Sequence, residues 1–387
     1  FLADLDEREA AEYFAQVHAA MTDGSLLLWV AHEQGRVLGS VQLSLCQKPN
    51  GLNRAEVQKL LVLSTARRRG VARLLMLAVE QEAAARERGL LYFATLSYAN
   101  EVTGQAGHRY LFRESNSAWM SARVLGEYLS WHQPRQHYHY ILIDDAWGRS
   151  MENALRQATG SSDRARHGRS VLPSGVVSRA QYRSVLAKAQ ASEADILVLV
   201  LLGDNLQRSM RLVHNLGLKE NMQIIVPNLT KSVVQNAGPL VMEGVIGTEA
   251  WTWELPRLDN NPDGQRFVQR YIDAHQEYPG STSASAYSVV KQWSAAVQRS
   301  QSLDSEKLIR ALEGHSYSLL KDQQQWRAFD HQNVQSIYAV RVRKRDEIMS
   351  DPFKQNYFEI IHRMAGDQAA PSLDDWQQER GEELTLQ

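Results

Sequence analysis

Short apolar runs separated by turn residues fill the first 95 positions of the chain. Leu26–Glu33 and Val37–Leu45 flank a Gln-Gly-Arg turn at 34–36, which is the pattern of a β-hairpin. A third run, Val57–Leu63, leads through a cluster of arginines into an amphipathic stretch that extends to about Arg88. The order of these patterns predicts three strands followed by a long helix.

From about Tyr98 onward, strand-like runs alternate with helical patterns. Examples are the strand Tyr138–Asp144, the helix Gln181–Ala191 and the strand Ala194–Val198. The longest apolar run, Ile196–Leu202, has the length of a buried strand and is far shorter than the ~20 residues of a membrane helix. The alternation predicts a mostly parallel α/β sheet. The polar tail after about position 366 predicts a loosely attached helix or a disordered end.

Composition narrows the class of protein. A chain of 387 residues should form two or three domains, at about 150 residues each. A formal net charge of −1 favours neither a nucleic acid nor a membrane surface as partner. The single cysteine, Cys46, excludes an intramolecular disulfide and is expected to be a small buried hydrophobe. The acidic N-terminus is not a secretory signal, so we expect a cytoplasmic protein, or a periplasmic one if the chain is a processed solute-binding protein.

The turn before the first long helix carries the clearest chemistry of the chain. It reads Arg-Arg-Arg-Gly-Val-Ala at 67–72 and lies between a predicted strand and a predicted helix. Gly70 lets the backbone approach a ligand closely, and the first N–H groups of a helix have no partners within the helix. The positive end of the helix dipole and the arginines favour an anion. The alternative is a basic helix start at which phosphate binding is incidental.

Arg67, Gly70 and Ala72, in the pattern Arg-x-x-Gly-x-Ala after a strand, resemble the acetyl-coenzyme A loop of the GNAT-superfamily N-acetyltransferases. The resemblance implies a truncated GNAT-like module at residues 1–95 that lacks the C-terminal part of the fold, with acetyl-CoA as cofactor. It implies that N–H groups of the loop hold the pyrophosphate and that the preceding strand binds the extended arm. The implied cofactor-binding residues are Leu61, Val62, Leu63, Arg67, Arg68, Arg69, Gly70, Val71 and Ala72.

The reaction that this resemblance implies is direct attack of an amine acceptor on the thioester carbonyl. A general base must take the amine proton, and Glu56 on the motif strand is the candidate by position. Glu56 could equally be a solvated carboxylate at the start of a strand. Tyr92 and Tyr98 are expected to be packing residues, so no general acid is assigned.

The rest of the chain carries a second set of ordered patterns. These include 100–104 followed by 109–113, the turn Asp145–Ser150, the segment Gly238–Gly247 and the segment Ala311–Gly314. Together they resemble the type-1 periplasmic solute-binding proteins, which are receptors of the leucine/isoleucine/valine and amide class of ABC importers. The resemblance implies a binding-protein module at residues 96–387 that lacks much of its first lobe.

The second resemblance also implies ligand-binding residues, namely Trp147, Leu202, Gly203 and Asn228. Leu202 and Asn228 stand where amino-acid binders tend to have Tyr and Glu, which favours an amide or other neutral solute over a zwitterion. For Trp147, packing in the core is an equal alternative, and for Asn228 the role of a turn residue is favoured. His137 and His139 are expected to be partly exposed strand residues, and no metal site is expected.

The fold class expected from both resemblances is α/β, with a truncated GNAT-like sheet followed by the incomplete binding-protein module. The functional hypothesis is an acetyl-CoA-dependent N-acetyltransferase fused to a module that binds a small amide or amino acid. The alternative is a ligand-binding receptor or cytoplasmic sensor without catalytic activity, whose N-terminal motif is a remnant of a chimera. Natural fusion, chimera and assembly error stay open, with the last two favoured. An exposed sheet edge near the seam at 92–100 predicts self-association.

Overall fold

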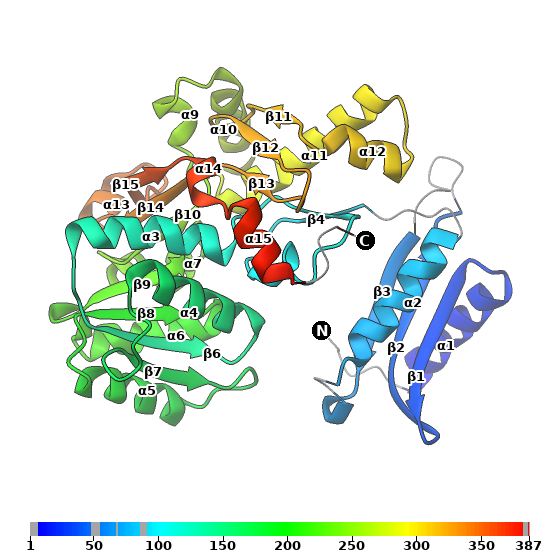
Figure 1. Ribbon diagram of the computed structural model, residues 1–387, viewed down its shortest axis with the longest axis horizontal. Helices are drawn as coiled ribbons and strands as arrows, with labels where there is room; N and C mark the ends of the chain where they lie inside the picture. The colour runs from blue at the N-terminus through cyan, green and yellow to red at the C-terminus, as the bar shows by residue number, and fades with distance from the viewer. Residues whose placement is uncertain (1–6, 48–54, 67–68, 86–90, 382–385, 387) are drawn as a thin grey trace. The chain divides into compact units, whose positions relative to one another are not determined.

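The computed structural model describes residues 7–47, 55–66, 69–85, 91–381 and 386 (Figure 1). The chain divides into two compact units. Unit 1 comprises residues 1–92 and 296–311, and unit 2 comprises residues 93–295 and 312–387. In the stretches that the structure describes, no helix is both long and apolar enough to cross a lipid bilayer.

Unit 1 contains an antiparallel sheet in the order β1-β2-β3, so β3 forms one edge of the sheet among the described residues. The elements are α1 (Glu7–Thr22), β1 (Leu26–Glu33), β2 (Arg36–Leu45), β3 (Ala55–Val62) and α2 (Val71–Ala85). The predicted hairpin, third strand and helix are therefore confirmed as elements. Cys46, just past β2, is partly exposed, so the expectation of a buried cysteine is wrong: the strand pattern ends one residue before it.

The core of unit 1 forms where α2 packs on the sheet. Val41, Leu43 and Leu45 alternate along β2 and are buried, as the two-residue period of a strand requires. Leu75 and Val79, four residues apart on one face of α2, complete this cluster. β3 ends at Val62 and α2 begins at Val71, and a short 3-10 turn at Ser64–Ala66 lies between them.

Unit 2 is built on a seven-stranded sheet in the order β15-β14-β10-β9-β8-β6-β7. Its strands are β6 (Tyr138–Ile143), β7 (Gly168–Leu172), β8 (Ile196–Val200), β9 (Gln223–Asn228), β10 (Ile246–Glu249), β14 (Ile337–Val342) and β15 (Phe358–Met364). The five strands β6 to β10 run parallel, and β14 pairs antiparallel with both β10 and β15. Every residue of β6 and β8 is buried, which explains their continuous apolar runs. The predicted, mostly parallel α/β sheet is confirmed.

Helices cover both faces of this sheet (Figure 1). They include α3 (Ala118–His132), α4 (Ala146–Thr159), α5 (Arg179–Ala191), α6 (Gly203–Asn215) and α7 (Lys231–Ala237). α3 packs against α4, whereas α5, α6 and α7 each pack against the next. Right-handed crossovers put α4 on one face and α5 to α7 on the other. The carboxyl ends of β8 and β9 therefore open beside the first turns of α6 and α7, a usual place for a ligand in such sheets.

Outside this sheet, the described part of unit 2 has only short strands, in a β4-β5 pair and a β11-β12-β13 sheet. They are β4 (Tyr92–Ala94, at the unit boundary), β5 (Leu111–Arg113), β11 (Ser316–Tyr317), β12 (Gln324–Trp326) and β13 (Asn333–Val334). The further helices of the chain are α8 (Pro239–Met242), α9 (Leu255–Leu258), α10 (Pro262–His275), α11 (Ser281–Ser300), α12 (Ser305–Leu312) and α13 (Arg345–Ser350). One large sheet accompanied by short strands agrees with the expected shortage of first-lobe strands.

The C-terminal tail is anchored to unit 2. It forms α14 (Gly366–Ala369) and α15 (Leu373–Arg380). Trp376 is 2% exposed, and its Nε1 donates a hydrogen bond to the carbonyl of Thr103 at 2.7 Å. Arg380 is buried as well and donates to the carbonyl of Gly104. The predicted helix is confirmed, but its loose attachment is wrong, because Trp376 and Arg380 are buried in a mostly polar segment, as are Ala369 and Ala370.

Candidate functional site

A cavity of about 260 Å³ lies at the carboxyl ends of β8 and β9 in unit 2. It brings together Leu202, Gly203 and Asn228, three of the four ligand-binding residues that the sequence predicts. The remaining lining residues are Leu96, Tyr98, Gln207, Thr230, Ser232, Val233, Asn236 and Thr282. At about 30 Å³ per molecule in liquid water, the space corresponds to roughly eight or nine water molecules, which suits a solute of amino-acid size.

The local backbone explains why Leu202 and Gly203 reach the cavity. After β8 the chain stays extended at Leu202, with φ −130° and ψ 164°, and turns at Gly203 with φ +53°. A positive φ is costly for a residue that carries a side chain, so glycine fits this turn into α6. The Leu202 side chain is 40% exposed and offers an apolar surface to the cavity.

Asn228, the last residue of β9, is held next to Tyr98. Asn228 is 3% exposed, and its side-chain Oδ1 has no hydrogen-bond partner within the described structure. Burial raises the pKa of the Tyr98 phenol and the nearby Glu249 carboxyl raises it further, whereas a hydrogen bond with the Asn228 side chain lowers it. The Tyr98 phenol therefore stays protonated at neutral pH next to the Asn228 side chain.

No charged side chain is among the residues that line this cavity. Hydroxyls and amides provide its polar surface, and Leu96, Leu202 and Val233 provide apolar surface. A charged ligand group would leave water without an opposite charge to compensate it. The cavity therefore suits a small, uncharged polar group that carries an apolar part.

Trp147, the fourth predicted ligand-binding residue, is not among the residues that line the cavity. It lies in the first turn of α4, where the Asp145 side chain accepts a hydrogen bond from the backbone N–H of Gly148 at 2.7 Å. Trp147 is 9% exposed and belongs to the main hydrophobic cluster of unit 2. Its indole N–H has no partner in the described structure. This placement agrees with the packing alternative that the sequence left open.

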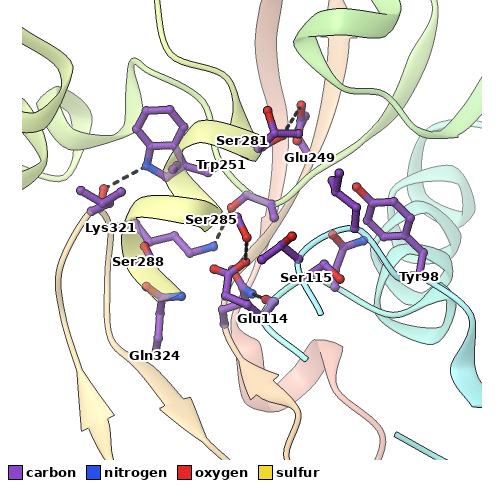
Figure 2. Close-up of a pocket in the computed structure, with 18 residues that line it drawn as sticks. Tyr98, Glu114, Ser115, Glu249, Trp251, Ser281, Ser285, Ser288, Lys321 and Gln324 are labelled. Atoms are coloured by element: carbon purple, nitrogen blue, oxygen red, sulfur yellow. Dashed lines mark hydrogen bonds between the residues drawn. The ribbon is translucent and has the colours of Figure 1, made fainter. Parts of the chain in front are cut away.

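A buried polar cluster adjoins the cavity and shares Tyr98 and Thr282 with it. Its charged members are Glu114, Glu249 and Lys321, drawn in Figure 2. They surround a space of about 30 Å³, which holds one or two water molecules. The cluster is thus too small for a solute.

Hydrogen bonds tie this cluster to the start of α11 and to the segments that leave and enter the large sheet. Glu114 accepts from Ser285, and Glu249 accepts from Ser281 at 3.1 Å (Figure 2). The Lys321 ammonium donates to the carbonyls of Ala250 at 2.6 Å and Ser336 at 2.8 Å. The cluster therefore links Glu114, the end of β10 at Glu249, the start of α11 and the segment from Lys321 to Ser336.

Burial shifts the titration of all three charged groups. It raises the pKa of Glu249 to about 8, although hydrogen bonds from Ser281 and from backbone N–H groups oppose the shift. It also raises the pKa of Glu114, and it lowers the pKa of Lys321 to about 8. Each shift has the sign expected when desolvation disfavours the charged form. At neutral pH the Glu249 carboxyl is therefore largely protonated.

In unit 1, part of the predicted coenzyme loop can be followed. Arg67 and Arg68 lie outside the described residues. Arg69 is exposed and forms an ion pair with Glu33 at 2.8 Å. Gly70 has φ +78°, and a Cβ added to it would meet no atom within 4 Å, so the backbone here is open to a ligand. α2 begins at Val71, which is buried, and Ala72 is exposed.

The predicted strand residues and base of this module lie at the edge strand. Leu61 and Leu63 are 53% and 43% exposed, and Val62 is partly buried opposite Gly39. Glu56 is exposed on β3, where its carboxylate accepts a hydrogen bond from the Gln58 side chain at 2.9 Å. An exposed carboxylate could act as the general base or could simply be solvated at the start of the strand, so the catalytic role of Glu56 stays a prediction.

The sequence did not point to several residues of the cavity. Tyr98, which we expected to pack, and Thr282 at the start of α11 both line it. No spacing in the sequence relates either residue to the ends of β8 and β9, because Tyr98 precedes the strands of the large sheet and Thr282 follows β10. Thr230 could have been found, because it comes two residues after the end of β9 and the positions just after a parallel strand lie at the ligand edge of the sheet.

The two histidines that the sequence analysis considered for a metal differ in their surroundings. His139, expected to be partly exposed, is buried on β6, and its ring nitrogens contact Ser192 Oγ at 3.1 Å and Ser170 Oγ at 3.0 Å. Burial lowers the pKa of His139 to about 4, so the ring is neutral. His137 is exposed, in line with the expectation.

Comparison with known proteins adds to this geometry. Residues 2–103 match the model of the acetyltransferase (GNAT) family. Residues 74–347 match the model of the periplasmic binding protein family. The two matches overlap from 74 to 103, across the predicted seam.

Solved structures of periplasmic binding proteins share the fold of the larger part of this chain. A periplasmic binding protein from Burkholderia mallei is 20% identical, with a TM-score of 0.67 over 82% of this chain and 78% of the other. An amino acid ABC transporter substrate-binding protein from Pseudomonas fluorescens Pf-5 is 20% identical, with a TM-score of 0.65 over 78% of each chain. A branched-chain amino acid ABC transporter periplasmic ligand-binding protein from Burkholderia xenovorans LB400 is 18% identical, with a TM-score of 0.65 over 80% of this chain and 78% of the other.

At such identities these similarities concern the fold, whereas the family match spans more than half of the sequence. Both agree with the mixed α/β fold built on the seven-stranded sheet. The chain belongs to the periplasmic binding protein family.

Proposed function

We propose that this chain is a solute-binding protein that takes a small amide or amino acid in the cavity at β8 and β9. The observation that carries the proposal is that Leu202, Gly203 and Asn228, chosen from the sequence alone, line one cavity of about 260 Å³. Ligands bind at this edge of parallel sheets because helix N-termini and strand ends leave backbone groups unpaired there. The binding module corresponds to residues 96–387.

Thermal unfolding in the presence of candidate solutes tests this proposal. A ligand at a hundred times its dissociation constant stabilises the folded state by about 2.7 kcal/mol. We expect a clear upward shift with at least one compound of a panel of L-leucine, L-alanine, acetamide, isobutyramide and urea. The variant Leu202→Trp should abolish the shift, because the larger side chain fills the cavity.

The matched control is Leu216→Trp. Leu216 follows the last turn of the same helix, α6, and is 47% exposed, so it receives the same substitution away from the cavity. The solute should raise the unfolding temperature of the control as much as that of the unchanged protein. A shift that survives Leu202→Trp, or no shift with any compound of the panel, would contradict the proposal.

A second function is favoured for the first module, residues 1–95. We propose that it binds acetyl-CoA, with the pyrophosphate on the loop 67–72 and the extended arm along Leu61–Leu63. Support comes from the family match at residues 2–103 and from the open, left-handed backbone at Gly70 immediately before α2. In the implied reaction an acceptor amine attacks the acetyl carbonyl, the C–S bond breaks, coenzyme A leaves and Glu56 receives the amine proton.

Acetyl-CoA binding is tested with two matched glycine substitutions. Gly70→Ala places a Cβ at the proposed pyrophosphate site, whereas Gly35→Ala makes the same change in the β1–β2 turn. Both glycines have nearly equal positive φ angles, +78° and +79°, and an added Cβ meets no atom within 4 Å at either position. The backbone strain is therefore the same, and only Gly70→Ala should remove the thermal shift caused by acetyl-CoA.

Equal shifts in both variants would contradict the site. If acetyl-CoA binds but no acetyl group reaches any of a set of amines, the module is a ligand-binding remnant without catalysis. The compartment follows from these results, since acetyl-CoA is cytosolic whereas the receptor of an importer works in the periplasm. Fractionation of cells that produce the chain tests that point directly.

A further inference from the structure

Helix α3 carries a row of four large side chains on its outer surface. Trp119, Arg123, Glu127 and Trp131 follow one another at intervals of four residues, so they form one row along the helix. Arg123 is exposed, Trp131 is 64% exposed, and Trp119 and Glu127 are partly exposed. The row therefore presents two aromatic rings and two opposite charges at the surface of unit 2.

A hollow of about 380 Å³ lies beside this row and is lined by all four of its residues. A second hollow, of about 340 Å³, shares Trp119 with the first and extends to α15. The first hollow exists because the neighbouring positions of α3 and α4 carry small side chains, namely Ala122, Gly126, Ala154 and Ala158. One face of unit 2 thus carries both a projecting ring, Trp131, and a depression that is lined by a second ring, Trp119.

Neighbouring residues hold the row in place and leave its charges accessible. The ring of Trp131 meets the ring of His362 edge-on, with centroids 5.2 Å apart. The same His362 contacts Oε1 of Glu127 at 2.9 Å, and Arg123 interacts electrostatically with Asp375. A tryptophan has only two side-chain torsions, so it offers a large contact area at a low cost in conformational entropy. Trp131 is therefore suited to enter a hollow on a partner.

The row is complementary to itself when it is read in the opposite direction. About its midpoint at position 125, Trp119 corresponds to Trp131 and Arg123 corresponds to Glu127. In a twofold dimer, residue i of one copy contacts residue j of the other, and residue j contacts residue i. Rows of residues four apart pack on one another at a crossing angle of about −50°, the commonest class of helix packing. The partner that fits both the charges and the hollow is therefore another α3.

We propose that a second copy of this chain docks on α3, with the two α3 helices antiparallel about a twofold axis near position 125. Trp131 of each copy enters the hollow beside Trp119 of the other copy. Arg123 of each copy pairs with Glu127 of the other. The aromatic rings supply most of the affinity, whereas ion pairs that stay partly solvated contribute little to it and mainly fix the orientation.

Sedimentation velocity of the full chain, at concentrations up to about 100 μM, which detects even weak dimers, tests the proposal. The unchanged chain should form dimers. Arg123→Glu brings two pairs of acidic side chains together across the axis, and Glu127→Arg brings two pairs of basic ones together. Each variant should raise the dimer dissociation constant at least tenfold, because like charges at an interface repel each other. Trp131→Ala should raise it at least tenfold as well, because it removes the ring that enters the hollow.

The matched control is Arg183→Glu. Arg183 is an exposed residue of α5, which covers the opposite face of the large sheet. The substitution changes the net charge by the same amount as Arg123→Glu and should alter the dissociation constant less than threefold.

An equal mixture of Arg123→Glu and Glu127→Arg is the decisive sample. Every acidic side chain of one variant then faces a basic side chain of the other at both ends of the interface. The two variants should therefore form a mixed dimer, seen with a fluorescent label on one of them, although each alone stays monomeric. This recovery distinguishes pairing across the axis from damage to the fold.

The remaining outcomes overturn the proposal. They are a monomer at every concentration of the unchanged chain, a dimer that Arg123→Glu and Trp131→Ala leave intact, and a mixture of the two charge variants that stays monomeric. If one charge variant does not fold in urea-unfolding controls, the exposed position Trp131→Ala decides. None of the substituted residues lines the solute cavity, so the result is independent of the proposed function.

Discussion

The variant Glu249→Gln should make unit 2 more stable at alkaline pH and leave it nearly unchanged at acidic pH. Glu249 is 4% exposed, and burial raises its pKa from 4.5 to about 8. The folded protein therefore holds a proton that the unfolded chain releases between these two values, and stability falls as pH rises through this window. At 1.36 kcal/mol per pH unit, the loss by pH 8 amounts to about 5 kcal/mol. Glutamine keeps the acceptor for Ser281 and removes the ionisation.

Urea unfolding at pH 5 and pH 8, followed by tryptophan fluorescence, measures this effect. Every tryptophan except Trp29 lies in unit 2, so the signal reports mainly on that unit. Burial also raises the pKa of Glu114, and Lys321, whose pKa is lowered to about 8, loses its charge around pH 8. Both groups are present in the two proteins that are compared. The control Glu220→Gln changes an exposed carboxylate and should not alter the difference between the two pH values. Equal pH dependence in Glu249→Gln and the unchanged protein would refute the reasoning.

Two further changes test the packing of unit 2 by the same urea assay. Gly126→Val should lower the free energy of unfolding by about 1–3 kcal/mol, because an added Cβ lies only 2.6 Å from the backbone oxygen of Ala158 on the facing helix. The control is Gly175→Val, where an added Cβ meets no atom within 4 Å. Equal losses of stability in the two variants would contradict the close helix contact. Trp376→Ala should cost about 3–5 kcal/mol, because it removes a buried ring and its hydrogen bond to Thr103. Trp376→Phe should cost less, and an unchanged midpoint in both Trp376 variants would show that the tail is not anchored.

The large elements of the fold were predictable because each has its own local pattern. The runs that became β1, β6 and β8 are long enough for their period to identify them, and the alternation of strands and helices predicts the parallel sheet. The tail was misjudged because its attachment depends on a few scattered buried residues, among them Ala369, Trp376 and Arg380, and a few such residues in a mostly polar segment produce no periodic signal.

The candidate site was predictable to the extent that it lies directly after strands. Leu202 and Asn228 follow or end parallel strands, and such positions meet at one sheet edge. Tyr98 and Thr282 line the cavity from segments that are nearly 200 positions apart in the sequence, so only the folded chain brings them together. The charged cluster at Glu249 was missed for the same reason.

The most direct test of the account is amide hydrogen exchange of the full chain, with and without saturating isobutyramide and, separately, L-leucine. The solute-binding proposal predicts slower exchange in the segments 202–207 and 228–236 with at least one of them. Exchange in α2 should not change. Protection elsewhere without protection of these two segments, while calorimetry shows binding, would place the site away from β8 and β9 and contradict the account.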